Sequence, residues 1–252
     1  MRIGSDKGYS VALGTFDGIH LGHLPVLRGA LERKSAQSMV VTFRSPPKKF
    51  LGGSDIPLLM TPECKIEALK ALGFDDCLVL DFADVRNIAP VEFLEGLLSK
   101  YNITSFSCGY NYRYGKEGLG NEKTLREFCA GRQISVNVYD EVKINGVTVS
   151  SSKIRAYIEA GEVEKARSFL GRPFGFSGKV VKGNGVGRKL GFPTVNQCPL
   201  MGLVMPRFGV YATNSVIDGR RYASITNVGI RPTFMSNAPV YETNIFGFDG
   251  DV

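Results

Sequence analysis

The stretch that decides the fold is SVALGTFDGIHLGH, residues 10–23, which contains both histidines of the 252-residue chain, His20 and His23. An apolar run opens it, and leucines follow at helical spacing over residues 24–31, so the pattern predicts a strand, a glycine-rich turn and a helix start. Glycines let a backbone approach a polyphosphate, helix-start N–H groups attract anions, and histidines three apart are expected on one side of the first helical turn. The simpler alternative is that one histidine caps the helix and the other is a chance neighbour. The combination of both histidines with the glycine-rich turn nevertheless predicts a nucleotide site.

Composition narrows the class of protein. A hydrophobic fraction of 43% and a formal net charge of +7 fit a globular protein with anionic partners. Lysines and arginines are dispersed, which favours small nucleotides over nucleic acid. Five cysteines without a C-x-x-C motif predict neither a disulfide framework nor a zinc site. We find no signal peptide and no membrane-length apolar run, so we expect a cytoplasmic protein without membrane contact; the oligomeric state is left open.

Strand and helix patterns alternate from residue 10 to about 140. Buried strands are expected at residues 39–43, 77–80, 105–108 and 134–139, and helices at 62–73, 90–101 and 121–130. Such alternation predicts a parallel sheet with crossover helices, whose ligands lie beyond the carboxyl ends of the strands. The histidine motif follows the first strand, as this rule requires.

The sequence pattern changes after residue 172, where helical periodicity ends and β-prone runs follow. An Asn-Gly hairpin is expected at residues 144–147, followed by helices at 152–160 and 162–170. Beyond them, β-prone runs occupy residues 177–181, 209–216, 222–227 and 240–246. We therefore expect an α/β domain over residues 1–172 and an all-β domain, a small barrel, over residues 173–252.

Two further motifs carry chemistry. Residues 109–115 read GYNYRYG, whose tyrosines could stack a flat ring beside the amide of Asn111, although a tyrosine-rich surface loop would look the same. Residues 150–155 read SSSKIR, whose hydroxyls could cap a helix or donate to phosphate, while Arg155 could grip phosphate through its planar fork.

The histidine motif resembles the HxGH signature of the nucleotidyltransferase superfamily. In the form GTFDGIHLGH it is similar to the adenylyltransferase half of the bacterial bifunctional riboflavin kinase/FAD synthetase family, and GYNYRYG and SSSKIR resemble two further signatures of that family. The resemblance implies a Rossmann-like nucleotidyltransferase domain with His20, His23, Asn111 and Arg155 as catalytic residues. It also implies that Gly14, Thr15, Phe16, Asp17, Gly18, Gly22, Ser151 and Ser152 bind ATP and its phosphates, and that Tyr110, Tyr112 and Phe43 contact flavin. The family's Phe-x-Pro-x-Pro loop is matched less well by residues 43–47.

The second domain carries its own resemblance. Residues 187–196, GRKLGFPTVN, resemble the riboflavin kinase signature, with Val195 where alanine is usual, and segments 227–234 and 242–246 match further family strings. The resemblance implies that Gly187, Arg188, Gly191, Thr194 and Asn196 bind a magnesium nucleotide, with Thr194 at the metal. In the family a further strand carries the proposed kinase base. The sequence given stops at Val252, so we expect an incomplete barrel and weak or absent kinase activity.

These observations predict FAD synthesis from ATP and FMN, with Mg²⁺, release of pyrophosphate and no nucleic-acid partner. Two alternatives stay open. One is another HxGH enzyme, a cytidylyltransferase acting on an alcohol phosphate, whose motif also begins Gly-Thr-Phe-Asp. The other is a non-catalytic protein that binds flavin.

Overall fold

The structure is a computed structural model that describes residues 7–32, 36–45, 56–183, 187, 191–230 and 239–250. Arg188, Pro46, Pro47 and the part of segment 227–234 after Ile230 lie outside these residues. The chain forms two compact units: residues 1–154 with 168–172, and residues 155–167 with 173–252.

The first unit is built on a five-stranded parallel sheet with the order β3-β2-β1-β4-β5. Its strands are β1 (Tyr9–Leu13), β2 (Gln37–Phe43), β3 (Asp76–Leu80), β4 (Ile103–Gly109) and β5 (Ser135–Tyr139). The order changes direction at β1, which lies between β2 and β4, and this is where open α/β sheets place their ligands. The predicted parallel sheet is confirmed.

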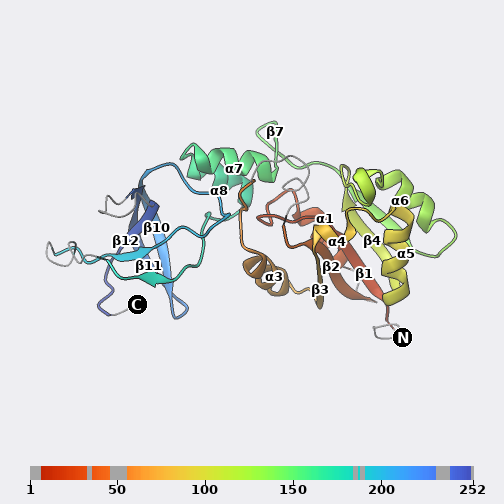
Figure 1. Ribbon diagram of the computed structural model, residues 1–252, viewed down its shortest axis with the longest axis horizontal. Helices are drawn as coiled ribbons and strands as arrows, with labels where there is room; N and C mark the ends of the chain where they lie inside the picture. The colour runs from red at the N-terminus through yellow and green to blue at the C-terminus, as the bar shows by residue number, and fades with distance from the viewer. Residues whose placement is uncertain are drawn as a thin grey trace. The chain divides into compact units, whose positions relative to one another are not determined.

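Helices cover both faces of this sheet (Figure 1). On one face α5 (Pro90–Lys100) and α6 (Glu122–Cys129) bury Leu94 and Leu125 against Phe106 of β4. On the other, α1 (Leu24–Leu31) and α3 (Pro62–Ala71) bury Leu27 and Leu69 against β1 and β2. A short α4 (Phe82–Val85) and a 3₁₀ turn at Lys116–Gly118 were not predicted.

Two of the strands expected to be buried are only half-buried. β3 and β5 are intermediate in exposure at nearly every position, whereas β1 is buried throughout. The cause is the strand order: β3 and β5 form the two edges of the sheet, and periodicity alone does not reveal which apolar runs take edge positions.

Local signals fix several element ends as expected. Thr61 caps α3, its hydroxyl accepting a hydrogen bond from the Cys64 N–H at 3.2 Å, and Gly73 follows the helix with φ +102°. Asn121 opens α6 with a reciprocal capping box. The Asn145-Gly146 turn, positive in φ at both residues, joins β6 (Lys143–Ile144) to β7 (Val147–Thr148).

The second unit contains a five-stranded antiparallel sheet with the order β10-β11-β12-β9-β8. Its strands are β8 (Val180–Val181), β9 (Val195–Gln197), β10 (Gly209–Ile217), β11 (Arg220–Ile230) and β12 (Pro239–Ile245). Two helices precede it in the chain, α7 (Ser151–Glu159) and α8 (Val163–Leu170). The predicted class, a parallel α/β domain followed by an antiparallel β domain, is confirmed.

Candidate active site

The site begins in the turn between β1 and α1, residues 14–23, which we call the phosphate turn. The Gly14 N–H donates to the Val41 carbonyl at 3.2 Å, so the turn leaves the sheet at the carboxyl ends of β1 and β2. Phe16, Gly18 and Ile19 have positive φ values of 51°, 84° and 40°. Gly18 also lies against Leu59, whose Cδ1 would be 2.7 Å from a Cβ at this position. A glycine is therefore required here by both φ and space.

The two histidines face each other at the end of this turn. Their rings stack with centroids 3.5 Å apart and planes 18° from parallel. The expectation that they belong to the first helical turn was wrong: α1 begins at Leu24, and a hydrogen bond of 2.8 Å from the His23 N–H to the His20 carbonyl closes a turn before it. A proline early in the helix, Pro25, suits this start because its missing N–H needs no partner there.

Burial sets the protonation of His23. Desolvation, with the nearby His20 and Lys65, holds the pKa of His23 well below its ordinary value of 6.5. The His20 backbone N–H points at Nδ1 of His23 at 3.4 Å, which favours the tautomer with its proton on Nε2. A neutral imidazole of this kind is a hydrogen-bond donor at physiological pH.

Phe16 and Asp17 support the turn from beneath. Phe16 is 1% exposed and packs edge-on against His23 with ring centroids 5.3 Å apart, so its ring lies in the core. Asp17 is also buried, and its Oδ1 accepts a hydrogen bond from the Leu59 N–H at 2.9 Å.

The SSSKIR segment reaches the same turn. Ser151, 134 residues further along the chain, donates from its hydroxyl to the Asp17 carbonyl at 2.9 Å. A Cβ at Gly22 would lie 3.0 Å from the Val149 carbonyl, so the residues just before Ser151 also pass close to the turn. The structure thus brings the HxGH and SSSKIR motifs together. Ser152 is exposed, and Arg155, one helical turn after Ser151, is buried.

The tyrosine loop divides between surface and core. Tyr110 and Asn111 are exposed after β4, while Tyr112 is half-buried and stacks on the buried Tyr114 with centroids 5.7 Å apart. Burial raises the pKa of Tyr112. Phe43, the third predicted flavin contact, is 8% exposed and packs edge-on against Phe82. Only Tyr110 of this trio therefore presents an exposed ring.

Two basic residues that the motifs do not reveal hold the phosphate turn. Lys65 of α3 is 4% exposed, and its Nζ donates to the carbonyls of Thr15, at 3.1 Å, and of Phe43. Arg172 donates from Nη2 to the Gly18 carbonyl at 2.7 Å and from Nη1 to the Ile19 carbonyl at 2.9 Å. The spacing of Lys65 four residues before the buried Leu69 was the one available signal, because it places the lysine on the inner face of its helix.

The kinase-like segment lies in the second unit. Gly187 approaches the Phe192 carbonyl, and a Cβ there would be 3.4 Å from the Thr194 hydroxyl. Asn196 is buried in β9 beside Gly183, and its Oδ1 has no hydrogen-bond partner among the described residues. Gly191 has φ +80°, and both it and Thr194 are exposed. The Asn196 amide oxygen and the Thr194 hydroxyl are oxygen donors of the kind that a hard cation such as Mg²⁺ prefers.

Within the described ranges, no cluster of three or more His, Cys, Asp or Glu side chains could hold a metal ion. In that same part of the chain, no helix is long and apolar enough to cross a membrane.

A parallel sheet with an HxGH turn at its switch point defines a nucleotidyltransferase-like domain, and comparisons with known proteins extend this assignment. The sequence model of FAD synthetase matches residues 3–153 and that of riboflavin kinase residues 170–252. The bifunctional riboflavin kinase/FMN adenylyltransferase of Bacillus subtilis is 34% identical over 96% of this chain and 79% of its own length. Its namesake from Escherichia coli K12 is 32% identical over 90% of this chain and 74% of its own length.

A solved structure agrees over the whole chain. The crystal structure of a protein named macrolide-efflux protein, from Streptococcus pneumoniae, superposes with a TM-score of 0.88 at 30% identity, covering 99% of this chain and 83% of that one. The chain belongs to the bifunctional riboflavin kinase/FMN adenylyltransferase family.

Proposed function

We propose that the protein transfers AMP from ATP to FMN. A phosphate oxygen of FMN attacks the α-phosphorus of ATP, the bond from that phosphorus to the bridging oxygen of the β-phosphate breaks, and pyrophosphate leaves with FAD as product. Such in-line transfer depends mainly on positioning and on neutralising phosphate charge. The observation that carries the proposal is the stacked His20–His23 pair, held at the sheet switch point in a chain of this family.

The described contacts support distinct roles for the site residues. His20 and His23 would donate to the triphosphate, and the neutral state of His23 leaves an N–H for this purpose. Gly14, Thr15, Asp17, Gly18 and Gly22 would shape the backbone around the phosphates, with Phe16 as support. Ser151 would hold the turn through Asp17, while Ser152 and Arg155 would bind the leaving pyrophosphate. Asn111 would orient the reacting groups, and Tyr110, with Tyr112 and Phe43 behind it, would contact the flavin.

Magnesium belongs to this proposal as a partner of the nucleotide. Mg²⁺ retains waters and is bound largely through substrate phosphates, so in the first unit we expect it to arrive with ATP. In the second unit Thr194 and Asn196 offer oxygen ligands, and we propose that they, with Gly187, Arg188 and Gly191, bind a magnesium nucleotide. We further propose a cytoplasmic protein whose partners are nucleotides and flavins.

A second activity, riboflavin phosphorylation, is suggested by the riboflavin kinase match over residues 170–252. We propose that the second unit takes part in this phosphorylation, in which a general base removes the proton of the attacking riboflavin hydroxyl. A positioned general base contributes about 10²- to 10⁴-fold. Incubation with riboflavin, ATP and Mg²⁺ tests this. FMN formation would support this activity, and Glu242, opposite Asn196 in the sheet, would be the first candidate base to substitute. Absence of FMN from a folded protein that binds ATP would contradict it.

The test of the main activity is chromatography of flavins after mixing the protein with FMN, ATP and Mg²⁺. FAD should form, should require FMN rather than riboflavin, and should stop when Mg²⁺ is chelated. Consumption of CTP with glycerol phosphate would favour a cytidylyltransferase. Binding of FMN without turnover would favour a flavin-binding protein.

A further inference from the structure

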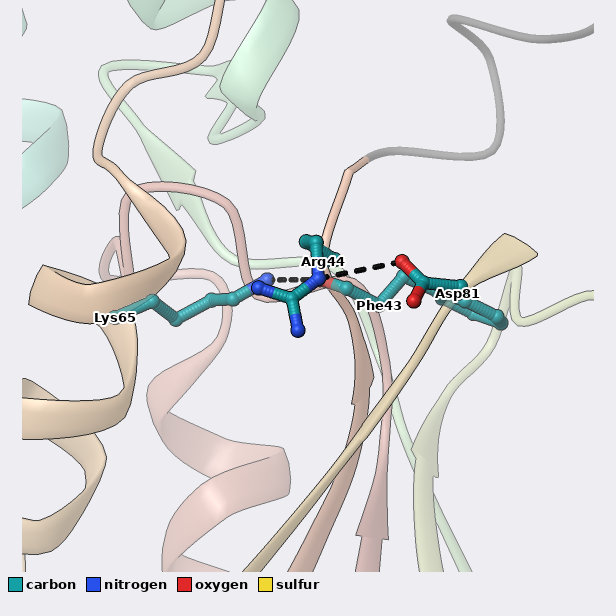
Figure 2. Close-up of polar contacts among 4 residues, drawn as sticks. All are labelled: Phe43, Arg44, Lys65 and Asp81. Atoms are coloured by element: carbon teal, nitrogen blue, oxygen red, sulfur yellow. Dashed lines mark hydrogen bonds and ion pairs between the residues drawn. The ribbon is translucent and has the colours of Figure 1, made fainter. Parts of the chain in front are cut away.

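Lys65 occupies an unusual place for a lysine. It lies in the first full turn of α3, and its ammonium group reaches the point where β1 and β2 end. Figure 2 shows the side chain extending from the helix to the carbonyl of Phe43, which is the last residue of β2. Its second acceptor, the Thr15 carbonyl, belongs to the phosphate turn and also accepts from the Thr42 hydroxyl at 2.8 Å.

These contacts tie three elements together. One ammonium group joins α3, the end of β2 and the phosphate turn through two backbone carbonyls. The next residue, Arg44, pairs with Asp81 after β3 at 3.3 Å (Figure 2), so the end of β2 is held from two sides. The Arg44–Asp81 pair is half-exposed and thus weak, whereas Lys65 is 4% exposed. Lys65 is therefore a buried polar anchor between α3 and the turn.

Several titratable groups surround this ammonium. The buried Asp17 carboxylate attracts it, Cys77 of β3 is close enough to influence it, and its charge in turn acts on His23, which stacks on His20. Beyond the turn, Arg172 contacts the Gly18 and Ile19 carbonyls. A buried positive charge in this position opposes protonation of a neighbouring imidazole and attracts an anion on the turn.

We propose that Lys65 is a positioning residue for adenylyl transfer: it fixes the phosphate turn through the Thr15 and Phe43 carbonyls and places a buried positive charge near His23. This charge adds to the desolvation that keeps His23 neutral and able to donate a hydrogen bond. The geometric part of this inference concerns the free protein alone, and only its catalytic consequence rests on the proposed function.

The ionisation of the two groups agrees with this arrangement. Burial lowers the pKa of Lys65 from 10.5 to about 8, although Asp17 opposes the shift. At neutral pH the lysine is therefore charged, and it loses its charge as the pH rises through about 8. The charge of Lys65 is also one of the causes that lower the pKa of His23.

The decisive experiment is proton NMR of the histidine rings in the free protein. Only two histidines are present, so His20→Gln assigns both ring signals. In Lys65→Met, which keeps most of the length of the side chain but removes its charge, the midpoint of the His23 titration should rise by about 0.5 or more. Lys70→Met is the matched control, because Lys70 lies on the same helix but is exposed. It should leave both midpoints unchanged.

Two further measurements complete the test. If Lys65→Met does not fold, the wild-type protein decides: one lysine ¹³Cε signal should titrate near pH 8, and the amide shifts of residues 14–18 should follow the same midpoint. FAD formation by Lys65→Met should fall about 10-fold or more, mainly in kcat. An unchanged His23 midpoint in a folded Lys65→Met, or lysine signals that all titrate above about pH 9.5, would overturn the proposal. Absence of FAD formation in the wild type would contradict the proposed function and leave the NMR result standing.

Discussion

At the scale of single residues, the site is a set of polar atoms held by buried neighbours. The imidazole of His23 stacks on His20 and packs edge-on against Phe16, while Ser151 donates to the carbonyl of Asp17. The backbone of the turn is thus fixed before any ligand binds, and a preorganised turn is what the stabilisation of phosphate charge requires.

Replacing either histidine should impair FAD formation far more than stability. We expect His23→Ala and His20→Ala to lower kcat by about 10²- to 10³-fold, the usual effect of removing one charge-stabilising donor. Steady-state rates at saturating ATP, with circular dichroism to verify folding, check this. Near-normal turnover in both variants would remove them from the phosphate site.

His23 should also make stability depend on pH. Because the folded chain holds the pKa of His23 below its ordinary 6.5, the unfolded chain binds more protons below that pH. Its contribution to stability is therefore complete above pH 6.5 and declines as the pH falls. Thermal unfolding between pH 7.5 and 5.5 should show a decreasing midpoint, with a smaller decrease in His23→Gln. Equal pH dependence in the two proteins would contradict the assignment.

At the scale of elements, α1 lies close against the sheet, and this close approach fixes the position of the phosphate turn. Gly29 of α1 faces the Tyr139 ring, which a Cβ would overlap, so the helix lies against β5 with no room for a side chain. Gly96 of α5 is also in a helix interior, but a Cβ there meets nothing within 4 Å.

This pair of glycines gives a matched stability test. Gly96→Ala should stabilise the protein by about 0.5 to 1 kcal/mol, through helix propensity alone. Gly29→Ala gains the same propensity but forces Tyr139 to move, so we expect a net destabilisation, with overpacking costing about 1 to 3 kcal/mol. Urea unfolding of both variants measures the difference. Equal stabilisation by the two substitutions would show that α1 can retreat from β5.

The sequence predicted where helices and strands form better than it predicted how deeply each one is buried. Sequence periodicity and turn residues predicted α3, α6 and the Asn145-Gly146 hairpin, because these signals are local. The edge positions of β3 and β5 follow from strand order, which no single segment encodes. Likewise the motifs predicted His20, His23 and Ser151 as site residues, whereas Lys65 and Arg172 are lysine and arginine, residue types that are common on any protein surface. Only the tertiary fold reveals that both bind backbone carbonyls of the phosphate turn.

At the scale of the whole molecule, the two family matches correspond to two sets of chemical groups. The proposed adenylylation residues precede residue 156, and the kinase-like segment follows residue 186. The two sets share no residue, so their activities should be separable by mutation.

Substitutions in the kinase-like segment should therefore spare FAD formation from FMN. We expect Thr194→Ala to change this rate by less than about twofold, because Thr194 is exposed in the second unit and contributes nothing to the proposed in-line transfer. The Thr194→Ala substitution should weaken the binding of magnesium nucleotide. Calorimetry measures this in proteins that also carry His23→Ala. A large loss of FAD formation in Thr194→Ala would show that the two activities depend on each other.

The measurement that tests the central claim most directly is the chromatographic yield of FAD from FMN, ATP and Mg²⁺, with His23→Ala in parallel. The account predicts that FAD and pyrophosphate accumulate in equal amounts with the wild-type protein, and about 10²- to 10³-fold more slowly with the variant. Absence of FAD from a folded wild-type protein that still binds ATP, or equal rates for the two proteins, would contradict it.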